Sequence, residues 1–269
     1  MSNSIGQHFT PWSLLKFAAP SIIMMTFMSL YTIVDGIFIS RFVGSNALSS
    51  LNIVFPVITL AIAIGTMFST GGNAVISKYL GEGNTKRACQ CLTQFVLFCV
   101  SLSIVLVVLS ILFASPISRF LGATDILIDD AVIYLRIVMA FAPACILQTL
   151  FQSYFVTAGH PGMGLGLMIV AGCTNAALDY VFIAAMHMGI GAALATGIGQ
   201  CIPAVAGVVF FLFTKKELRF TRCGFYPKET AKAAFNGSSE MVTELSTAII
   251  TFLFNIILLR LAGEHGVAA

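Results

Sequence analysis

The chain has 269 residues, of which 58% are hydrophobic and only 9% are charged, and its formal net charge is +3. An average soluble domain is about 25% charged, so this composition excludes an ordinary soluble globular protein. The small positive charge does not predict binding to nucleic acid, because the basic residues lie in links between apolar runs.

Apolar runs of about 20 residues recur along the chain, and each is long enough to cross a hydrocarbon core of about 30 Å. The sequence therefore predicts an all-α polytopic membrane protein. The first run follows Lys16 and is too long for the apolar part of a signal peptide, so it predicts a retained helix. The seven expected helices cover residues 13–40, 46–77, 92–114, 131–158, 163–186, 189–214 and 234–262.

The expected helices divide the chain into three parts. Residues 1–214 form an N-terminal six-helix lobe, residues 215–233 form a basic cytoplasmic loop, and residues 234–269 begin an incomplete second lobe. A faint repeat supports this division, because "TIVDGIFISRFVGSNALSS" and "TFLFNIILLRLAGEHGVAA" share Thr, Ile, Arg and Gly at aligned positions. Repeated lobes are common in secondary transporters, and the repeat predicts a protein truncated after its seventh helix.

The distribution of Lys and Arg predicts the orientation in the membrane. Ten basic residues lie on the side of the N-terminus, and four lie on the other side. The first group is Lys16, Lys78, Lys86, Arg87, Lys215, Lys216, Arg219, Arg222, Lys228 and Lys232. The second group is Arg41, Arg119, Arg136 and Arg260. We therefore expect a cytoplasmic N-terminus.

Two aspartates, Asp35 and Asp179, lie inside expected membrane helices. An aspartate at the centre of a membrane helix costs about 2.5–3.5 kcal/mol on insertion scales, so its presence favours a function or a buried partner. Asn175 precedes Asp179 by four residues, which places both side chains on one helix face. The less specific interpretation is that these polar side chains only snorkel or hold helices together.

The depths of these groups along their helices are similar. From the inner side, the rise is about 30 Å to Asp35 and about 24 Å to Asp179, and Thr196 lies about 10 Å below the outer side. All of them are therefore expected in the outer half of the membrane. Two carboxylates, an amide and a hydroxyl at one depth predict an oxygen-rich pocket suited to Na⁺, or to a proton on a carboxylate.

Other polar and soft side chains are weaker candidates. Tyr31, Gln148 and Gln152, with Met28 as a soft wall, are suggested to line a substrate cavity, although helix packing explains them equally well. Glu240 and Glu244 are expected at the inner entrance of the seventh helix, where the helix dipole favours a carboxylate.

The motifs that the chain lacks narrow the function. It has no G-x-x-x-x-G-K-[ST] loop for ATP, and its seven cysteines lack metal-ligand spacing. Neither H-E-x-x-H nor G-x-S-x-G occurs, which disfavours an enzyme. We expect no cofactor and no metal beyond a coupling Na⁺ at Asp35 and Asp179.

Five segments together resemble the multidrug and toxic compound extrusion (MATE) transporters of bacteria. They are "AAPSIIMM" with Pro20, "VDGIFISRFVGSNALSSLNIVFP", "GGNAVISKYLGEGNTKRA", "TNAALDYVFI" followed by "MGIGAALATGIGQ", and "NGSSEMVTELSTAIITFLFNIILLRLAGEHGVAA". The resemblance extends over essentially the whole chain. It implies a twelve-helix, two-lobe fold, of which this chain holds the first lobe and helix 7.

The resemblance also implies an activity and a site. Such transporters export cationic amphipathic drugs in exchange for Na⁺ or H⁺. For this protein the resemblance implies the bacterial inner membrane, and we expect the full-length protein to be a monomer. Their ion site matches Asp35, Asn175, Asp179 and Thr196 of this chain. The family usually has proline after the helix 5 aspartate, where this chain has Tyr180, so the local bend is expected to differ.

Three alternatives remain open from the sequence. The nearest is a lipid-linked precursor flippase of the same superfamily, although such flippases have a cationic cavity and no arginine lies deep in the first six expected helices. The second is an intramembrane enzyme, for which the Gly-x-Gly-Asp motif of aspartyl proteases is absent. The third is a fragment that does not transport by itself.

Overall fold

The computed structural model describes residues 45–186, 190–214 and 218–267, with a few isolated residues before position 34. The first expected helix, 13–40, therefore lies almost wholly outside the described residues. Within the described part, all regular structure is helical, and no strand occurs there. Five helices are long and apolar enough to cross a membrane, and a bent pair of helices brings the number to six when the pair is counted as one span. The predicted all-α membrane fold is confirmed.

The first two described helices are α2 (Ser45–Gly81) and α3 (Thr85–Leu112). The sequence predicted that α3 begins at residue 92, but it begins at Thr85 because the Asn84 side chain caps it. The carboxamide oxygen of Asn84 accepts the Arg87 N–H at 3.2 Å. The turn before it needs Gly83, whose φ of +74° is rarely adopted by other residues. Most of residues 78–91, which were expected to link two helices, are therefore helical.

The fourth expected helix, 131–158, is broken in the structure. It consists of α5 (Ile128–Ala140) and α6 (Ala142–Thr157), whose axes differ by 46°. The break is explained by Pro143 in the first turn of α6, because proline has no N–H to continue the hydrogen bonding of α5. A short helix that was not predicted, α4 (Ala114–Phe120), precedes this pair.

The remaining elements are α7 (Pro161–Asp179), the π-helix η2 (Tyr180–Ala185), α8 (Gly191–Phe213) and α9 (Pro227–Val267). The helix expected from residue 234 begins at Pro227, because proline is favoured at the first helical position and Glu229 complements the positive end. The prediction that Glu240 and Glu244 lie at the helix entrance is therefore wrong, since Glu240 lies about 20 Å along α9.

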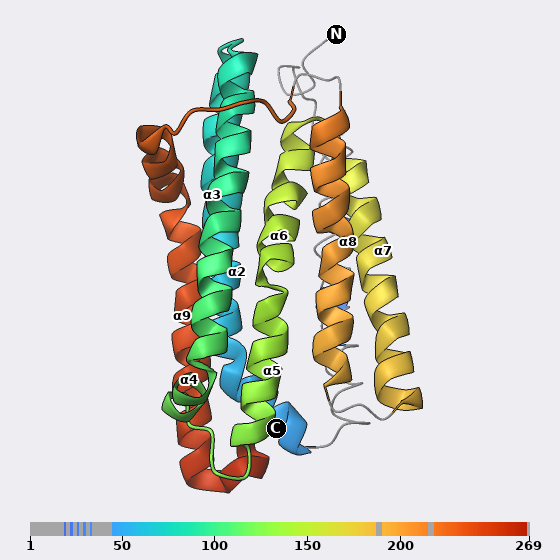
Figure 1. Cartoon of the computed structure of the whole chain (residues 1–269), viewed down its shortest axis with the longest axis vertical. Helices are drawn as coiled ribbons and strands as arrows, with labels where there is room; N and C mark the ends of the chain where they lie inside the picture. Colours follow the sequence, from blue (N-terminus) through green and yellow to red (C-terminus); the bar gives the residue numbers. More distant parts are fainter. Residues whose placement is uncertain are drawn as a thin grey trace.

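The helices pack side by side in one bundle (Figure 1). Helix α2 contacts α9, α6 and α3, while α7 packs on α8 and α8 packs on α6. The core between α6 and α8 is aromatic, with the ring of Phe211 5.6 Å from those of Phe151 and Phe155. Tyr154 is fully buried and donates its hydroxyl hydrogen to the Phe68 carbonyl of α2 at 2.9 Å. These contacts fix α6 between α2 and α8.

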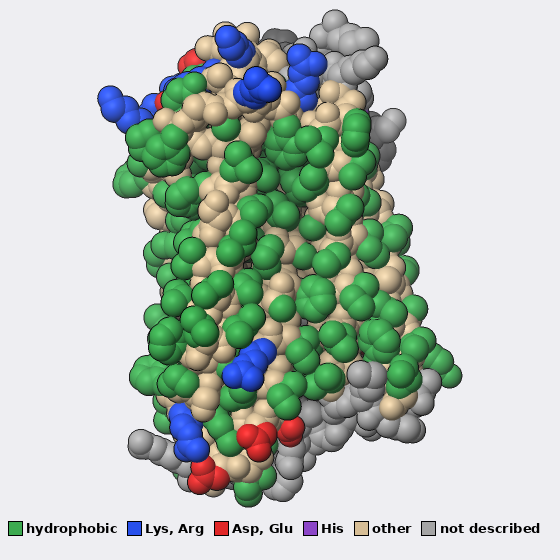
Figure 2. All heavy atoms as spheres, in the orientation of Figure 1, with side chains coloured by type: hydrophobic (Ala, Val, Ile, Leu, Met, Phe, Trp, Pro, Cys, Tyr) green, Lys and Arg blue, Asp and Glu red, His purple; other side chains and the backbone are tan. Residues whose placement is uncertain are grey.

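The charged side chains gather at the two ends of the bundle. Figure 2 shows Lys and Arg clustered at the end that carries the turn between α2 and α3, separated by a broad hydrophobic band from acidic side chains at the other end. Among the described residues, the acidic end includes Asp125, Asp129 and Asp130. A band of this kind is the surface expected of a protein that spans a bilayer. We call the end rich in Lys and Arg the basic end.

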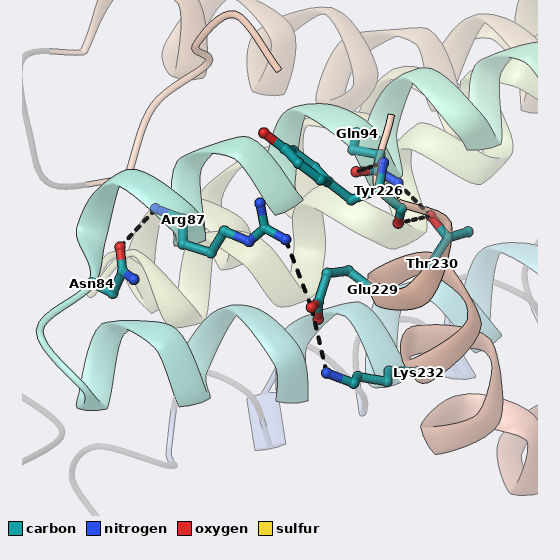
Figure 3. Close-up of polar contacts among 7 residues, drawn as sticks. All are labelled: Asn84, Arg87, Gln94, Tyr226, Glu229, Thr230 and Lys232. Carbon is teal, nitrogen blue, oxygen red and sulfur yellow. Dashed lines mark hydrogen bonds and ion pairs between the residues drawn. The ribbon is translucent and has the colours of Figure 1, made fainter. Parts of the chain in front are cut away.

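The linker between α8 and α9, residues 218–226, is fixed on α3 (Figure 3). The Gln94 side chain accepts the Tyr226 N–H at 3.1 Å and donates to the Tyr226 carbonyl at 2.9 Å, so one amide pairs with the main chain in both directions. Arg87 stacks over the Tyr226 ring at 3.8 Å and lies 3.8 Å from the Glu229 carboxylate. Lys232 approaches the same carboxylate at 3.4 Å. The linker is therefore a fixed part of the first lobe.

Replacing Gln94 by leucine is expected to release this linker. The Tyr226 N–H would lose its acceptor, and the Tyr226 carbonyl would keep only its donors from Glu229 and Thr230. Cys89, which is 3% exposed under the linker, would then open to solvent. A loss of about 1.4 kcal/mol in hydrogen bonding is expected to make a soluble maleimide label Cys89 roughly tenfold faster. Peptide mass spectrometry measures the labelling rate. Gln90→Leu, on the same helix, is the matched control. Equal labelling in both variants would show that other contacts hold the linker.

Candidate functional site

One face of α7 carries the polar groups predicted to bind a coupling ion. Its buried residues are Gly164, Met168, Ala171, Asn175 and Asp179, at spacings of three or four. That spacing places them on one stripe directed into the lobe. The stripe is apolar toward the basic end and polar toward the acidic end, so the polar groups gather in the half of the bundle where α7 ends and α8 begins.

The structure brings Asn175 and Thr196 together from different helices. The Asn175 amide donates to the Thr196 hydroxyl at 3.2 Å, which joins α7 to α8. Asn175 is 2% exposed, and its carbonyl oxygen has no hydrogen-bond partner among the residues that the structure describes. Asp179 is fully buried one turn further along the same stripe. Three of the four predicted ligands therefore lie in one region, and Asp35 lies outside the described residues.

The close approach of α7 and α8 at this region depends on a glycine. A Cβ added at Gly199 would lie 3.2 Å from both the Ala171 carbonyl oxygen and the Asn175 Cβ. The segment "GIGAALATGIG" is rich in small residues, which allow helices to pack closely, but the sequence does not say which helix it meets. Gly199 is thus a residue of the site that sequence reasoning missed, and its only signal was the density of small residues.

The helix changes type directly after Asp179. The α-helix ends at Asp179 and the π-helix begins at Tyr180, which is the position where the family usually has proline. A π-helix is rare and is frequent at functional sites, because the wider turn leaves the α-helical hydrogen-bond pattern. The chain therefore departs from α geometry at the expected position without a proline.

The donor set fits a small hard cation or a proton. Asp179, Asn175 and Thr196 offer a carboxylate, an amide carbonyl and a hydroxyl, all oxygen ligands. The Asn175 carbonyl oxygen is buried without a described partner, and burying such a group is costly unless something else satisfies it. These three residues would hold the ion, together with groups that lie outside the described part of the chain.

Two of the four proposed cavity residues are described, and both lie on α6. The Gln148 amide donates to the Met168 sulfur of α7 at 3.6 Å, and its carbonyl oxygen is buried without a partner in the described residues. Gln152 lies one turn further along α6. Tyr31 and Met28 fall outside the described residues. That these residues line a substrate cavity stays a prediction.

Thr196→Val is expected to destabilise the protein by about 1–3 kcal/mol, because it leaves the buried Asn175 amide without its acceptor. A matched control is Thr66→Val on α2, whose hydroxyl bonds only within its own helix. Unfolding of the purified chain in detergent measures both variants. A loss in the control as large as in Thr196→Val would contradict a special role for the link between α7 and α8.

Comparisons with known proteins agree with this architecture. The model of the MatE family matches residues 20–181. A multidrug export protein MepA of Staphylococcus haemolyticus is 23% identical over 209 residues, covering 77% of this chain and 46% of the relative. A second MepA, from Staphylococcus saprophyticus, is 24% identical over 74% of this chain and 44% of its own length. The chain therefore spans about half the length of the curated relatives it matches.

Solved structures show the same fold. An inward-facing multidrug resistance MATE family transporter superposes with a TM-score of 0.83 at 21% identity, over 89% of this chain and 55% of that protein. A structure named protein A superposes with a TM-score of 0.91 at 25% identity, over 99% of this chain and 60% of that one. Since the family model also matches more than half of the sequence, the chain belongs to the MatE family.

Proposed function

We propose that this chain is the first lobe and the opening helix of a cation-coupled antiporter that exports cationic amphipathic compounds. The observation that carries the proposal is the buried region of Asp179, Asn175 and Thr196. Among the described residues, Asp179 and Glu229 are the only buried acidic or basic side chains. Glu229 lies in the first turn of α9 beside Arg87 and Lys232, so Asp179 is the buried acidic side chain away from the basic end.

The relatives support export as the activity. The matched Staphylococcus proteins are named multidrug export proteins, and a matched structure is a multidrug resistance transporter. We assign the protein to the bacterial inner membrane with a cytoplasmic N-terminus. Lys and Arg gather at one end of the bundle, and an excess of these residues marks the cytoplasmic side of a membrane protein. Membership of a family with transporter relatives also argues against the intramembrane enzyme.

The flippase alternative finds less support in the described residues. A cavity for a phosphate-bearing lipid precursor would need buried cations, and no Lys or Arg is buried in the described part of the chain. The buried acidic group is of the opposite sign and suits a cationic ligand. We therefore retain the drug antiporter as the one proposed function.

Coupling in this proposal acts through the charge of Asp179. Entry of Na⁺ or H⁺ from the outer side neutralises the carboxylate and changes how α7 packs on α8. The π-helical turn after Asp179 gives the segment a second hydrogen-bond pattern, so a local charge change can alter its geometry. Export then follows only if the ion and the drug prefer different states of the two lobes.

The test is efflux of a fluorescent cationic dye from cells that express the reading frame extended past Ala269. Asp179→Asn is expected to abolish efflux, whereas Asp130→Asn, at an exposed position, leaves it unchanged. External Na⁺ at fixed pH then distinguishes Na⁺ from H⁺ as the coupling ion. Efflux by Asp179→Asn equal to that of the wild type would overturn the proposal.

A further inference from the structure

A pocket of about 270 Å³ lies between α3 and the linker at the basic end of the bundle. Its α3 wall includes Leu97 and Phe98, and its linker wall is formed by residues 223–225. Leu97 is 56% exposed and Phe225 is 73% exposed, so the walls are apolar and open to the outside of the bundle. A groove of this kind on a membrane-spanning helix faces lipid.

The linker wall is held in place and is not a loose loop. Gln94 lines the same pocket and pairs with the Tyr226 main chain on both its donor and acceptor sides. Thr221 donates its N–H to the Thr93 hydroxyl at 3.0 Å, which fixes the other end of the wall to α3. The pocket is therefore preformed, and the ordering of the linker is not a cost of binding.

Three exposed basic residues lie close in sequence to the linker wall of this pocket, and none of them forms an ion pair among the described residues. Arg219, Arg222 and Lys228 are exposed, and they lie next to the pocket in sequence. The nearby carboxylate of Glu229 forms ion pairs with Arg87 and Lys232, so it does not neutralise the three exposed cations. Figure 2 shows several Lys and Arg side chains at this end of the molecule, with a few acidic side chains beside them, next to the hydrophobic band.

We propose that this pocket binds an anionic phospholipid, with an acyl chain between Leu97 and Phe225 and the headgroup phosphate on the cations of the linker. Apolar walls, with exposed cations on the neighbouring residues of the same linker, match the two parts of such a lipid. Basic pockets between membrane helices are known to take anionic headgroups. The site is separate from Asp179, which lies toward the opposite end of the bundle.

The test is native mass spectrometry of the purified 269-residue chain titrated with phosphatidylglycerol or with phosphatidylcholine. We expect tighter binding of phosphatidylglycerol, and the double variant Arg222→Gln, Lys228→Gln is expected to weaken it about fivefold for each charge removed. Lys78→Gln with Lys86→Gln removes two charges at the same end and is expected to change binding less than twofold.

A second variant tests the apolar part of the pocket. Ser101 is an exposed residue that lines the pocket, and Ser101→Phe would fill part of the pocket while leaving every charge in place. This variant is therefore expected to weaken the binding of phosphatidylglycerol as strongly as the linker variant does. Equal binding of the two lipids would overturn the proposal. So would equal losses in the two double variants, or full binding by Ser101→Phe, because each would mean diffuse attraction to a basic surface.

Discussion

Replacing Gly71 by alanine is expected to force α9 away from α2 and to lower the unfolding temperature of the chain in detergent. A Cβ at Gly71 would overlap the Ala233 carbonyl oxygen and lie 2.7 Å from the Gly237 nitrogen. Both are backbone atoms and cannot rotate aside. Overpacking costs about 1–3 kcal/mol, and the backbone clash places this case at the upper end.

The better helix propensity of alanine offsets part of that cost, by about 1 kcal/mol. A net loss of about 2 kcal/mol corresponds to a decrease of about 4–8 °C for a chain of this size. Gly65→Ala is the matched control, because a Cβ there would meet its neighbours at 3.4 Å, an ordinary contact distance. A decrease in the control equal to that in Gly71→Ala would contradict backbone contact between α2 and α9 as the cause.

Gly199→Val is expected to separate α7 from α8 and to disrupt the candidate ion site. The branched side chain would press on the Ala171 carbonyl and on Asn175, both about 3.2 Å from the added Cβ. We expect a loss of about 2–3 kcal/mol in stability. Efflux by the extended protein is also expected to fall, because the Asn175–Thr196 hydrogen bond crosses the same interface.

Gly166→Val controls for the change of residue type. Gly166 lies on α7 with no atom within 4 Å of an added Cβ, so its stability is expected to change by about 0.5 kcal/mol or less. Unfolding in detergent and dye efflux would be measured for both variants. If Gly199→Val unfolds like the wild type, the two helices do not pack as closely at Asn175 as the structure shows.

The six spans expected after residue 45 could be predicted in order from the sequence, the fourth of them as a bent pair of helices, and the helix ends could not. Hydrophobicity fixes where a chain crosses a membrane, because every apolar run of sufficient length is stable there. The ends of the helices depend on single capping or proline residues, which the hydropathy of a long segment does not detect. The Asn84 cap started α3 earlier than predicted, Pro227 started α9 earlier, and Pro143 broke the fourth span in two.

The site was predicted in part. The four-residue spacing of Asn175 and Asp179 sufficed to place them on one face of α7, because a helix has a fixed period. That Thr196 meets Asn175 could only be inferred from depth and family resemblance, and the structure confirms that contact. The predicted role of Asp35 lies outside the described residues and remains a prediction, as does the ion-binding role of the group.

Sequence alone determined the class of protein, the order of the described spans and the face of α7 that carries the polar groups, because these follow from composition and from the period of one helix. Tertiary structure decided which helices meet. Three contacts join segments that are separate in the sequence: Gly71 with Gly237, Gly199 with Asn175, and Gln94 with Tyr226. Such contacts arise from how close two backbones can approach and which polar groups must be satisfied on burial, and both depend on the packing of the whole bundle.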